Sequence, residues 1–258
     1  MEKLEKHGTL WSRDELILAL DLYCRIPFKK TKANNPLVIE LANAIGRTPA
    51  SVARKLGNFG SFDPQLKKRE ISGLSHTSEL DKEIWEQYSS DWSQLIHKAS
   101  RLRRSGDYAG GTGNQYSANI VPPKGPSEKQ ATQKVRLHQQ FFRDAVLSSY
   151  NGTCCVTGLG VMECLVASHI IPWALDSTRR VDPTNGLCLS ATFDCLFDSG
   201  LVTISTSLQV VISRKLLKRR EKEIQESICA YHKRPIIMPS RFLPARDCLE
   251  WHNNNVFQ

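Results

Sequence analysis

A change in composition over residues 105–129, SGDYAGGTGNQYSANIVPPKGPSEK, most constrains how this 258-residue chain can fold. Glycine, serine, proline and asparagine dominate the stretch, and its few apolar residues follow no regular period. Such a segment buries too little apolar surface to order itself and is typical of a flexible linker. We therefore expect two domains, at residues 1–104 and 130–258, and the chain is long enough for each to bury a core.

Capping signals indicate that the first domain is helical. Ser12 followed by Glu15 makes a capping box ahead of a long apolar run. A second helix is expected between Pro36 and Gly46, because proline favours the first turn and glycine the end of a helix. Thr48 is expected to cap a third helix. Further apolar periodicity predicts one or two more helices before the linker.

The second and third helices, separated by a glycine turn, form a helix-turn-helix pattern. The expected outer face of the third helix consists of Ser51, Arg54, Lys55 and Asn58. Side chains of these types reach phosphates and base edges in a DNA major groove. An all-helical scaffold with a polar surface is the alternative, and the positive charge of the chain favours DNA binding.

The charge balance points to a polyanionic partner. The chain has 35 Lys and Arg against 26 Asp and Glu, a formal charge of +9. Basic residues gather at 28–32, 53–55, 66–69, 101–104 and 213–220. Any one of these clusters is equally compatible with a solvated face. Together they favour double-stranded DNA as the partner.

Other classes of protein are disfavoured by the sequence. No run of about 18 apolar residues predicts a membrane span, and the N-terminus lacks the apolar core of a signal peptide. We expect a cytoplasmic protein with no membrane partner, whose eight cysteines stay reduced. No CxxC pair occurs, so buried thiols are favoured and a structural zinc site is not expected. The crowded cysteines are Cys154, Cys155, Cys164, Cys188 and Cys195.

The second domain mixes helix and strand. An amphipathic helix is expected over about 130–149, with Val135, Phe142 and Val146 facing inward. The β-prone segments ECLVASHIIPW and GLVTISTSLQVVIS predict short strands around one small helix. The whole chain is therefore expected to be α+β, with an all-α first domain.

A set of spaced motifs in this domain carries a family resemblance. The pattern CCVTGLG…LVASHIIPW…RRVDPTNGLCLSATFDCLFDSGLVTIS resembles the HNH endonuclease family, whose site is a ββα-metal hairpin and helix. It is most similar to a restriction-type subgroup with the arrangement SHIxPW…NGL…D…FDxGL. The flanking segments QQFFRDAVLSSY and LEWHNNNVF also fit, so the resemblance covers about residues 130–258.

The resemblance implies a hydrolytic site with named parts. His169 corresponds to the general base of the family, and a neutral imidazole suits that task near neutral pH. Asn185, in TNGL, corresponds to the asparagine that braces the hairpin loop and helps hold the histidine.

A divalent cation, Mg²⁺ or Mn²⁺, is the implied cofactor. Asp194 and Asp198 are four residues apart and share one face if the segment is helical, so their carboxylates suit such an ion. Asp198 has a second interpretation, as a cap for the turn that follows. Many family members carry a metal-ligating Asp or His just before the base, where this chain has Ser168, a poorer ligand. Either the metal shell differs here or water fills the gap.

Two arginines and three possible functions complete the expectations. Arg179 and Arg180 lie between the hairpin strands, as phosphate clamps or as ordinary exposed residues. We expect a metal-dependent DNA endonuclease of restriction or defence type that leaves 5′-phosphate and 3′-hydroxyl ends. Cutting both strands with one such site calls for a homodimer. Ser168 leaves open an alternative, an inactive DNA-binding regulator on the same fold, but the presence of His169, Asn185 and Asp194 together argues against it. A nuclease acting on RNA or on foreign DNA is a third interpretation.

Overall fold

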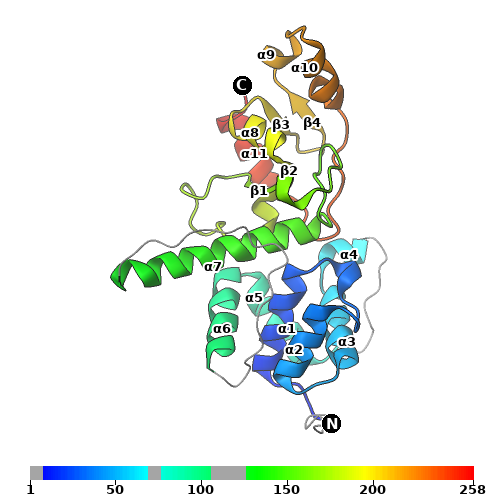
Figure 1. Ribbon diagram of the computed structural model, residues 1–258, viewed down its shortest axis with the longest axis vertical. Helices are drawn as coiled ribbons and strands as arrows, with labels where there is room; N and C mark the ends of the chain where they lie inside the picture. Colours follow the sequence, from blue (N-terminus) through cyan, green and yellow to red (C-terminus); the bar gives the residue numbers. More distant parts are fainter. Residues whose placement is uncertain (1–7, 69–76, 106–125) are drawn as a thin grey trace. The chain divides into compact units, whose positions relative to one another are not determined.

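The computed structural model describes residues 8–68, 77–105 and 126–258 (Figure 1). The chain forms two compact units, Met1–Ser148 and Ser149–Gln258. Most of the expected linker, residues 106–125, lies outside the described residues, and the chain is helical from Pro126 onward. That helix, which the sequence analysis grouped with the second domain, falls almost entirely within the first unit.

The described part of the first unit is helical and contains no strand. Its elements are α1 (Arg13–Arg25), a 3₁₀ turn (Phe28–Lys30), α2 (Pro36–Ile45), α3 (Pro49–Gly60), α4 (Pro64–Lys68), α5 (Glu79–Ser89), α6 (Trp92–Arg104) and α7 (Pro126–Ser149).

The helix ends lie where the capping signals predicted them. Ser12 Oγ accepts a hydrogen bond from the backbone of Glu15 at 3.3 Å, and the Glu15 carboxylate accepts one from the Ser12 backbone at 2.8 Å. Thr48 Oγ1 caps α3 through the Ser51 backbone at 3.1 Å. Gly46 ends α2 with a φ of 69°, a conformation that glycine adopts without strain.

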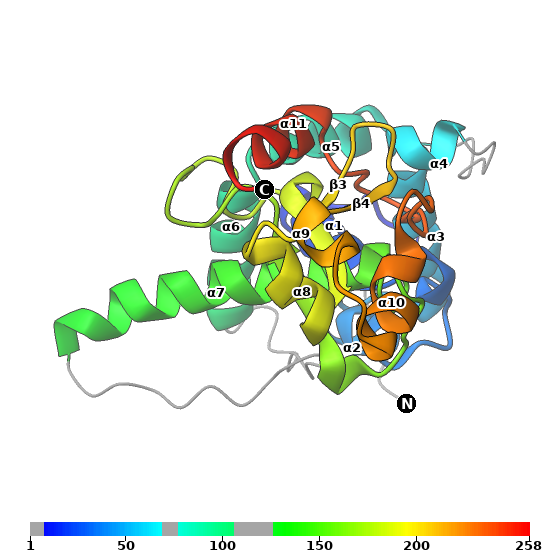
Figure 2. The same ribbon diagram turned by 90° about the horizontal axis from the view of Figure 1, so that it is seen from above.

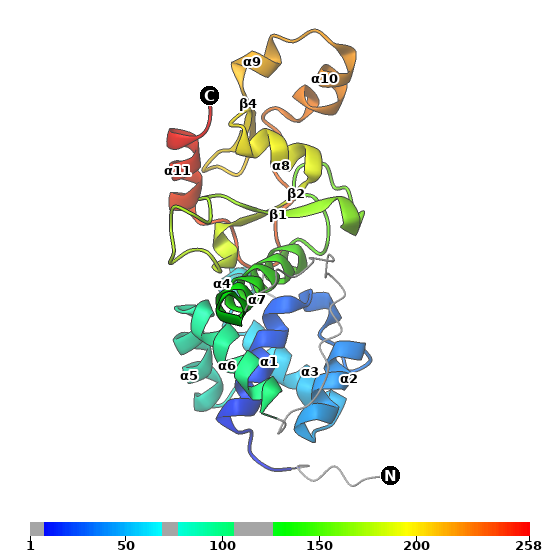
Figure 3. The same ribbon diagram turned by 60° about the vertical axis from the view of Figure 1, so that its left-hand side comes forward.

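Helix α1 forms the centre of the unit, between α5 and α6 on one side and α2 and α3 on the other (Figure 3). Leu16, Leu20 and Tyr23 are completely buried. Two of its acidic side chains are also buried and paired. Glu15 binds Arg47 at 2.8 Å, and Asp21 binds both Arg25 and Arg103.

The carboxylate of Asp21 also connects α1 to α6 and, through Arg25, to α7. Burial by itself raises the pKa of Asp21, but Arg25 and Arg103 outweigh it and lower that pKa below its ordinary value. Arg25 Nη1 also contacts Asp144 Oδ2 at 2.9 Å. On the apolar face of α7, Phe142 is buried as predicted. The prediction for Val135 is wrong, because its side chain is 41% exposed.

The expected outer face of α3 is exposed only in part. Arg54 is exposed and Ser51 is partly exposed. The prediction is wrong for Lys55 and Asn58, because α5 covers that side of the helix. Lys55 Nζ lies 2.8 Å and 2.9 Å from the two carboxylate oxygens of buried Asp81, and Asn58 Nδ2 donates to the same carboxylate at 3.3 Å.

The buried carboxylate of Asp81 therefore stabilises the contact between α3 and α5. Asp81→Ala is expected to lower the free energy of unfolding by about 3 kcal/mol, because it leaves the Lys55 ammonium without its partner in a largely buried position. Glu83→Ala is the matched control. Its ion pair with Arg13 joins side chains that are 60% and 42% exposed, so the cost should stay below about 1 kcal/mol. Urea unfolding followed by circular dichroism checks both values, and equal losses would contradict the role of Asp81.

The second unit has two small antiparallel sheets and short helices. Its elements are a 3₁₀ turn (Met162–Cys164), β1 (Leu165–His169), a 3₁₀ turn (Pro183–Asn185), β2 (Gly186–Ser190), α8 (Ala191–Asp198), β3 (Val202–Ile204), β4 (Val210–Ile212), α9 (Arg214–Leu217), α10 (Lys222–Ser227), a 3₁₀ turn (Cys229–Tyr231) and α11 (Arg246–Asn255).

Strands β1 and β2 with α8 form a ββα arrangement. The strands pair antiparallel from Leu165 opposite Ser190 to His169 opposite Gly186, and α8 begins directly after β2. The helix packs against both strands through its apolar face, where Phe193 and Phe197 are buried. The expectation of short strands around a small helix is confirmed.

Two further predictions concern the cysteines and membrane-spanning helices. The thiols of Cys154, Cys155 and Cys188 are buried, as predicted. The prediction of burial is wrong for Cys164 and Cys195, which are exposed. Among the described residues, no helix combines the length and the apolar character needed to cross a bilayer.

Candidate active site

His169 lies at the end of β1 with its ring in a fixed orientation. Its Nε2 is 3.0 Å from the backbone carbonyl oxygen of Arg180, and its ring meets that of Trp173 edge-on at 5.7 Å between centroids. A carbonyl oxygen can only accept, so Nε2 carries the hydrogen and the lone pair of the neutral ring is on Nδ1. Burial lowers the pKa of His169 below its ordinary value, and the hydrogen bond to Arg180 opposes that effect.

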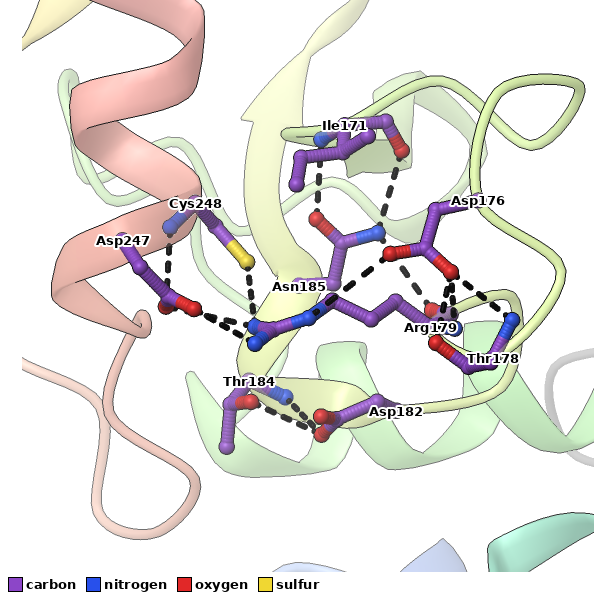
Figure 4. Close-up of polar contacts among 9 residues, drawn as sticks. All are labelled: Ile171, Asp176, Thr178, Arg179, Asp182, Thr184, Asn185, Asp247 and Cys248. Carbon is purple, nitrogen blue, oxygen red and sulfur yellow. Dashed lines mark hydrogen bonds and ion pairs between the residues drawn. The ribbon is translucent and has the colours of Figure 1, made fainter.

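The side-chain amide of Asn185 holds the loop that supplies the carbonyl group (Figure 4). Its Oδ1 accepts from the Ile171 backbone at 2.8 Å, and its Nδ2 donates to the Ile171 carbonyl at 3.0 Å and to the Arg179 carbonyl at 3.3 Å. Asn185 is only 1% exposed. The amide thus fixes both ends of the loop, next to His169 and next to Arg180.

Arg179 is held by acidic neighbours (Figure 4). Its guanidinium makes two hydrogen bonds to Asp247 on α11, at 3.2 Å and 2.5 Å, and one to Cys248 Sγ at 2.8 Å. Asp176 lies 3.9 Å from Arg179 Nε. The charge of Arg179 is therefore compensated within the unit.

Arg180 is arranged differently. Its Nε donates to the Trp173 carbonyl at 2.8 Å, and its guanidinium lies 5.5 Å from the centroid of the Trp173 ring. Its two terminal nitrogens have no hydrogen-bond partner among the described residues. Trp173 was not among the residues predicted for the site, but it contacts both His169 and Arg180.

The two carboxylates lie on α8, with Asp194 partly exposed and Asp198 exposed. Although Asp198 is exposed, partial desolvation of its carboxyl raises its pKa, and the negative charge of Asp194 raises that pKa further. The two carboxylates are therefore close enough to repel each other. On β1, directly before His169, Ser168 is 3% exposed and its Oγ has no hydrogen-bond partner among the described residues.

Asp194, Asp198 and Ser168 suit a metal ion that takes only part of its coordination shell from protein side chains. Within the described ranges, no group of three or more His, Cys, Asp or Glu side chains converges on one point. Mg²⁺ often binds through one or two carboxylates, with water and phosphate oxygens completing the shell. The repelling pair on α8 suits that mode of binding, and the unpaired Ser168 hydroxyl is one further polar atom.

His252, which the sequence analysis could not interpret, is a buried link between α11 and the rest of the unit. Its Nε2 lies 3.1 Å from the Phe197 carbonyl, and its Nδ1 lies 2.8 Å from Thr203 Oγ1. The ring stacks on Phe197 at 3.7 Å. His252 therefore anchors the C-terminal end of α8, and no feature of the local sequence pointed to that contact.

Comparison with known families addresses the ββα region. Residues 154–205 match the model of the HNH endonuclease family. The match includes β1, β2, α8 and β3, so the expected HNH domain is confirmed for this segment and indicates a nuclease. HNH nucleases generally use a divalent metal ion. A search of curated proteins finds no match for the chain.

The buried ring of His252 predicts a loss of stability in acid. Burial lowers its pKa to about 4, whereas an unfolded histidine titrates near 6.5. Between these values the unfolded chain binds a proton that the folded unit does not bind, so the free energy of unfolding falls as pH decreases from 6.5 to 4. The titration of His252 is expected to lower the free energy of unfolding by about 3 kcal/mol once the pH is below both pKa values.

Urea unfolding at several pH values between 4 and 6.5 tests this contribution against His252→Gln. The glutamine variant should be less stable at pH 7 but should show a shallower pH dependence. An identical slope in both proteins would contradict the assignment.

Proposed function

We propose that the second unit is a metal-dependent DNA endonuclease of the restriction or defence type, with His169 as its general base. The supporting observation is the fixed tautomer of His169. Its Nε2 donates to the Arg180 carbonyl, so the basic nitrogen is Nδ1, and the lowered pKa keeps the ring neutral at pH 7.

The proposed reaction is hydrolysis of a phosphodiester. A water oxygen attacks phosphorus while His169 Nδ1 takes a proton from that water. The bond between phosphorus and the 3′ oxygen breaks, and the departing oxygen takes a proton from solvent. The products are a 5′-phosphate and a 3′-hydroxyl, and the proton on His169 is then released to solvent.

Asp194 and Asp198, with Ser168 as a weaker ligand, are the residues proposed to hold Mg²⁺ or Mn²⁺. Bound there, such an ion would neutralise charge that develops on the phosphate and on the leaving oxygen. Arg180 is proposed to contact the phosphate through its two terminal nitrogens. Arg179 is a weaker candidate, because Asp247 already compensates its charge.

The first unit is proposed to bind DNA through a helix-turn-helix-like arrangement of α2 and α3. Arg54 and Ser51 remain candidates for DNA contact on α3, whereas Lys55 and Asn58 serve the contact with Asp81. Cleavage of both strands by one site per chain is proposed to require a homodimer.

Cleavage of supercoiled plasmid in Mg²⁺ or Mn²⁺ tests the proposal. The wild type should cut, and chelation of the metal should stop it. His169→Ala should cut at least about 100-fold more slowly, because general-base catalysis contributes about 10²–10⁴-fold. His232→Ala removes another histidine of the same unit and should cut at the wild-type rate. Both unmodified and cytosine-modified plasmids are needed, since the sequence motifs do not specify the substrate.

Two outcomes contradict the proposal. Full cutting by His169→Ala would show that another group is the base. No cutting of any substrate, combined with tight DNA binding, would favour the inactive regulator, a reading supported by Ser168 in place of a carboxylate.

The pKa of His169 predicts an acidic limb in the rate profile. Only the neutral ring can accept a proton, so kcat/KM should fall about tenfold per pH unit below the pKa of His169. Because burial lowers that pKa, the midpoint of the limb should lie below 6.5. Cleavage of a short duplex over pH 4.5–8 measures the limb at about half-unit steps. A midpoint above 6.5 would mean that another group controls the rate.

A further inference from the structure

Residues 213–220 form a basic segment, SRKLLKRR, which has five Lys and Arg and no acidic residue. It covers the N-terminal cap and all of α9 and the three residues that follow. All five basic side chains are exposed. The proposed catalytic role leaves this concentration of charge unexplained.

Most of this positive charge is not compensated by the residues that the structure describes. Arg219 pairs with Glu221 at 2.5 Å. The other four basic residues make no ion pair with any described residue, and they are Arg214, Lys215, Lys218 and Arg220. Like charges held close together repel one another, so a polyanion that supplies counter-charge binds favourably at such a surface.

The basic segment is also firmly attached to the unit. Leu216 is buried, and Ser213 Oγ accepts from the Leu216 backbone at 3.4 Å. The Ser213 backbone donates to the Leu201 carbonyl at 2.9 Å. The basic side chains therefore project from a defined position on the folded unit.

That position is next to the helix that carries the two carboxylates. Leu201, the partner of Ser213, follows Asp198 by three residues, and its own backbone donates to the Leu196 carbonyl of α8 at 2.9 Å. Beyond α10, Tyr231 packs edge-on against Phe193 of α8 at 5.5 Å. Helices α8, α9 and α10 accordingly lie together in the same part of the unit (Figures 1 and 2).

We propose that the basic segment binds the phosphate backbone of duplex DNA beside the HNH site and so holds the strand against α8. This inference rests on the proposed nuclease function for its biological meaning. The contact is one of charge rather than of base recognition, because lysine and arginine side chains on phosphates read no sequence.

Salt dependence of binding tests the contact directly. Each lost phosphate contact reduces the slope of log K against log salt by about 0.9, so three lost contacts reduce it by about 2.7. The test variant carries Lys215→Gln, Lys218→Gln and Arg220→Gln in a His169→Ala background. Fluorescence anisotropy with a labelled duplex of about 30 base pairs, at several salt concentrations, measures the slope.

A matched control removes three surface cations that lie outside the basic clusters and pair with carboxylates, with Lys82→Gln, Lys98→Gln and Arg246→Gln. The slope should fall clearly more in the basic-segment variant than in the control. An unchanged slope in the basic-segment variant, or equal losses in the two variants, would overturn the proposal.

A second substrate separates this inference from the proposed function. With His169 intact, the basic-segment variant should hydrolyse bis(4-nitrophenyl) phosphate at the wild-type rate, because that substrate has a single phosphate. Its kcat/KM on duplex DNA should fall. If neither protein hydrolyses any substrate, the nuclease proposal fails while the binding slopes still decide the role of the basic segment.

Discussion

The buried amide of Asn185 determines the geometry of the candidate site. Its Oδ1 accepts a hydrogen bond from the Ile171 backbone N–H, and its Nδ2 donates to the carbonyl oxygens of Ile171 and Arg179. The amide therefore holds both ends of the loop between β1 and β2. The Arg180 carbonyl belongs to that loop, and it fixes the tautomer of His169. The Asn185 amide thus acts through the loop on which nitrogen of His169 carries the hydrogen. Loss of the amide would remove the partner of two buried backbone groups of Ile171 and of the part-buried Arg179 carbonyl, which is costly.

The lysines and arginines behind the net charge of +9 fall into two classes. Some form ion pairs that stabilise the fold, and others remain available to a ligand. Arg25, Lys55 and Arg179 each bind a carboxylate of another helix or loop. Arg54, Arg180 and most of the basic segment have no such partner among the described residues. The net charge therefore says little about binding until these two classes are separated, because a compensated cation contributes little to the field that a polyanion meets.

Local signals in the sequence predicted much of this structure. Helix caps depend on residues a few positions apart, so the ends of α1, α2 and α3 could be predicted from the sequence. The ββα region was predictable because its spaced motif resembles a family. Side-chain partners were not, since Asp81 lies 26 residues from Lys55 and Asp247 lies 68 residues from Arg179. Helical periodicity placed Lys55 and Asn58 on an outer face, but it contains no information on which helix covers that face.

A lowered pKa alone does not identify a general base in this chain. Burial is the largest cause of a lowered pKa for His97, His169 and His252. His252 is 2% exposed and cannot meet a substrate water, and His97 lies 3.2 Å from another imidazole nitrogen, that of His138. His169 differs because it remains partly exposed at the end of a strand, and a carbonyl oxygen defines its tautomer. Access and orientation, which depend on the hairpin, therefore favour His169 as the proposed general base, and its desolvation lowers the pKa of the ring.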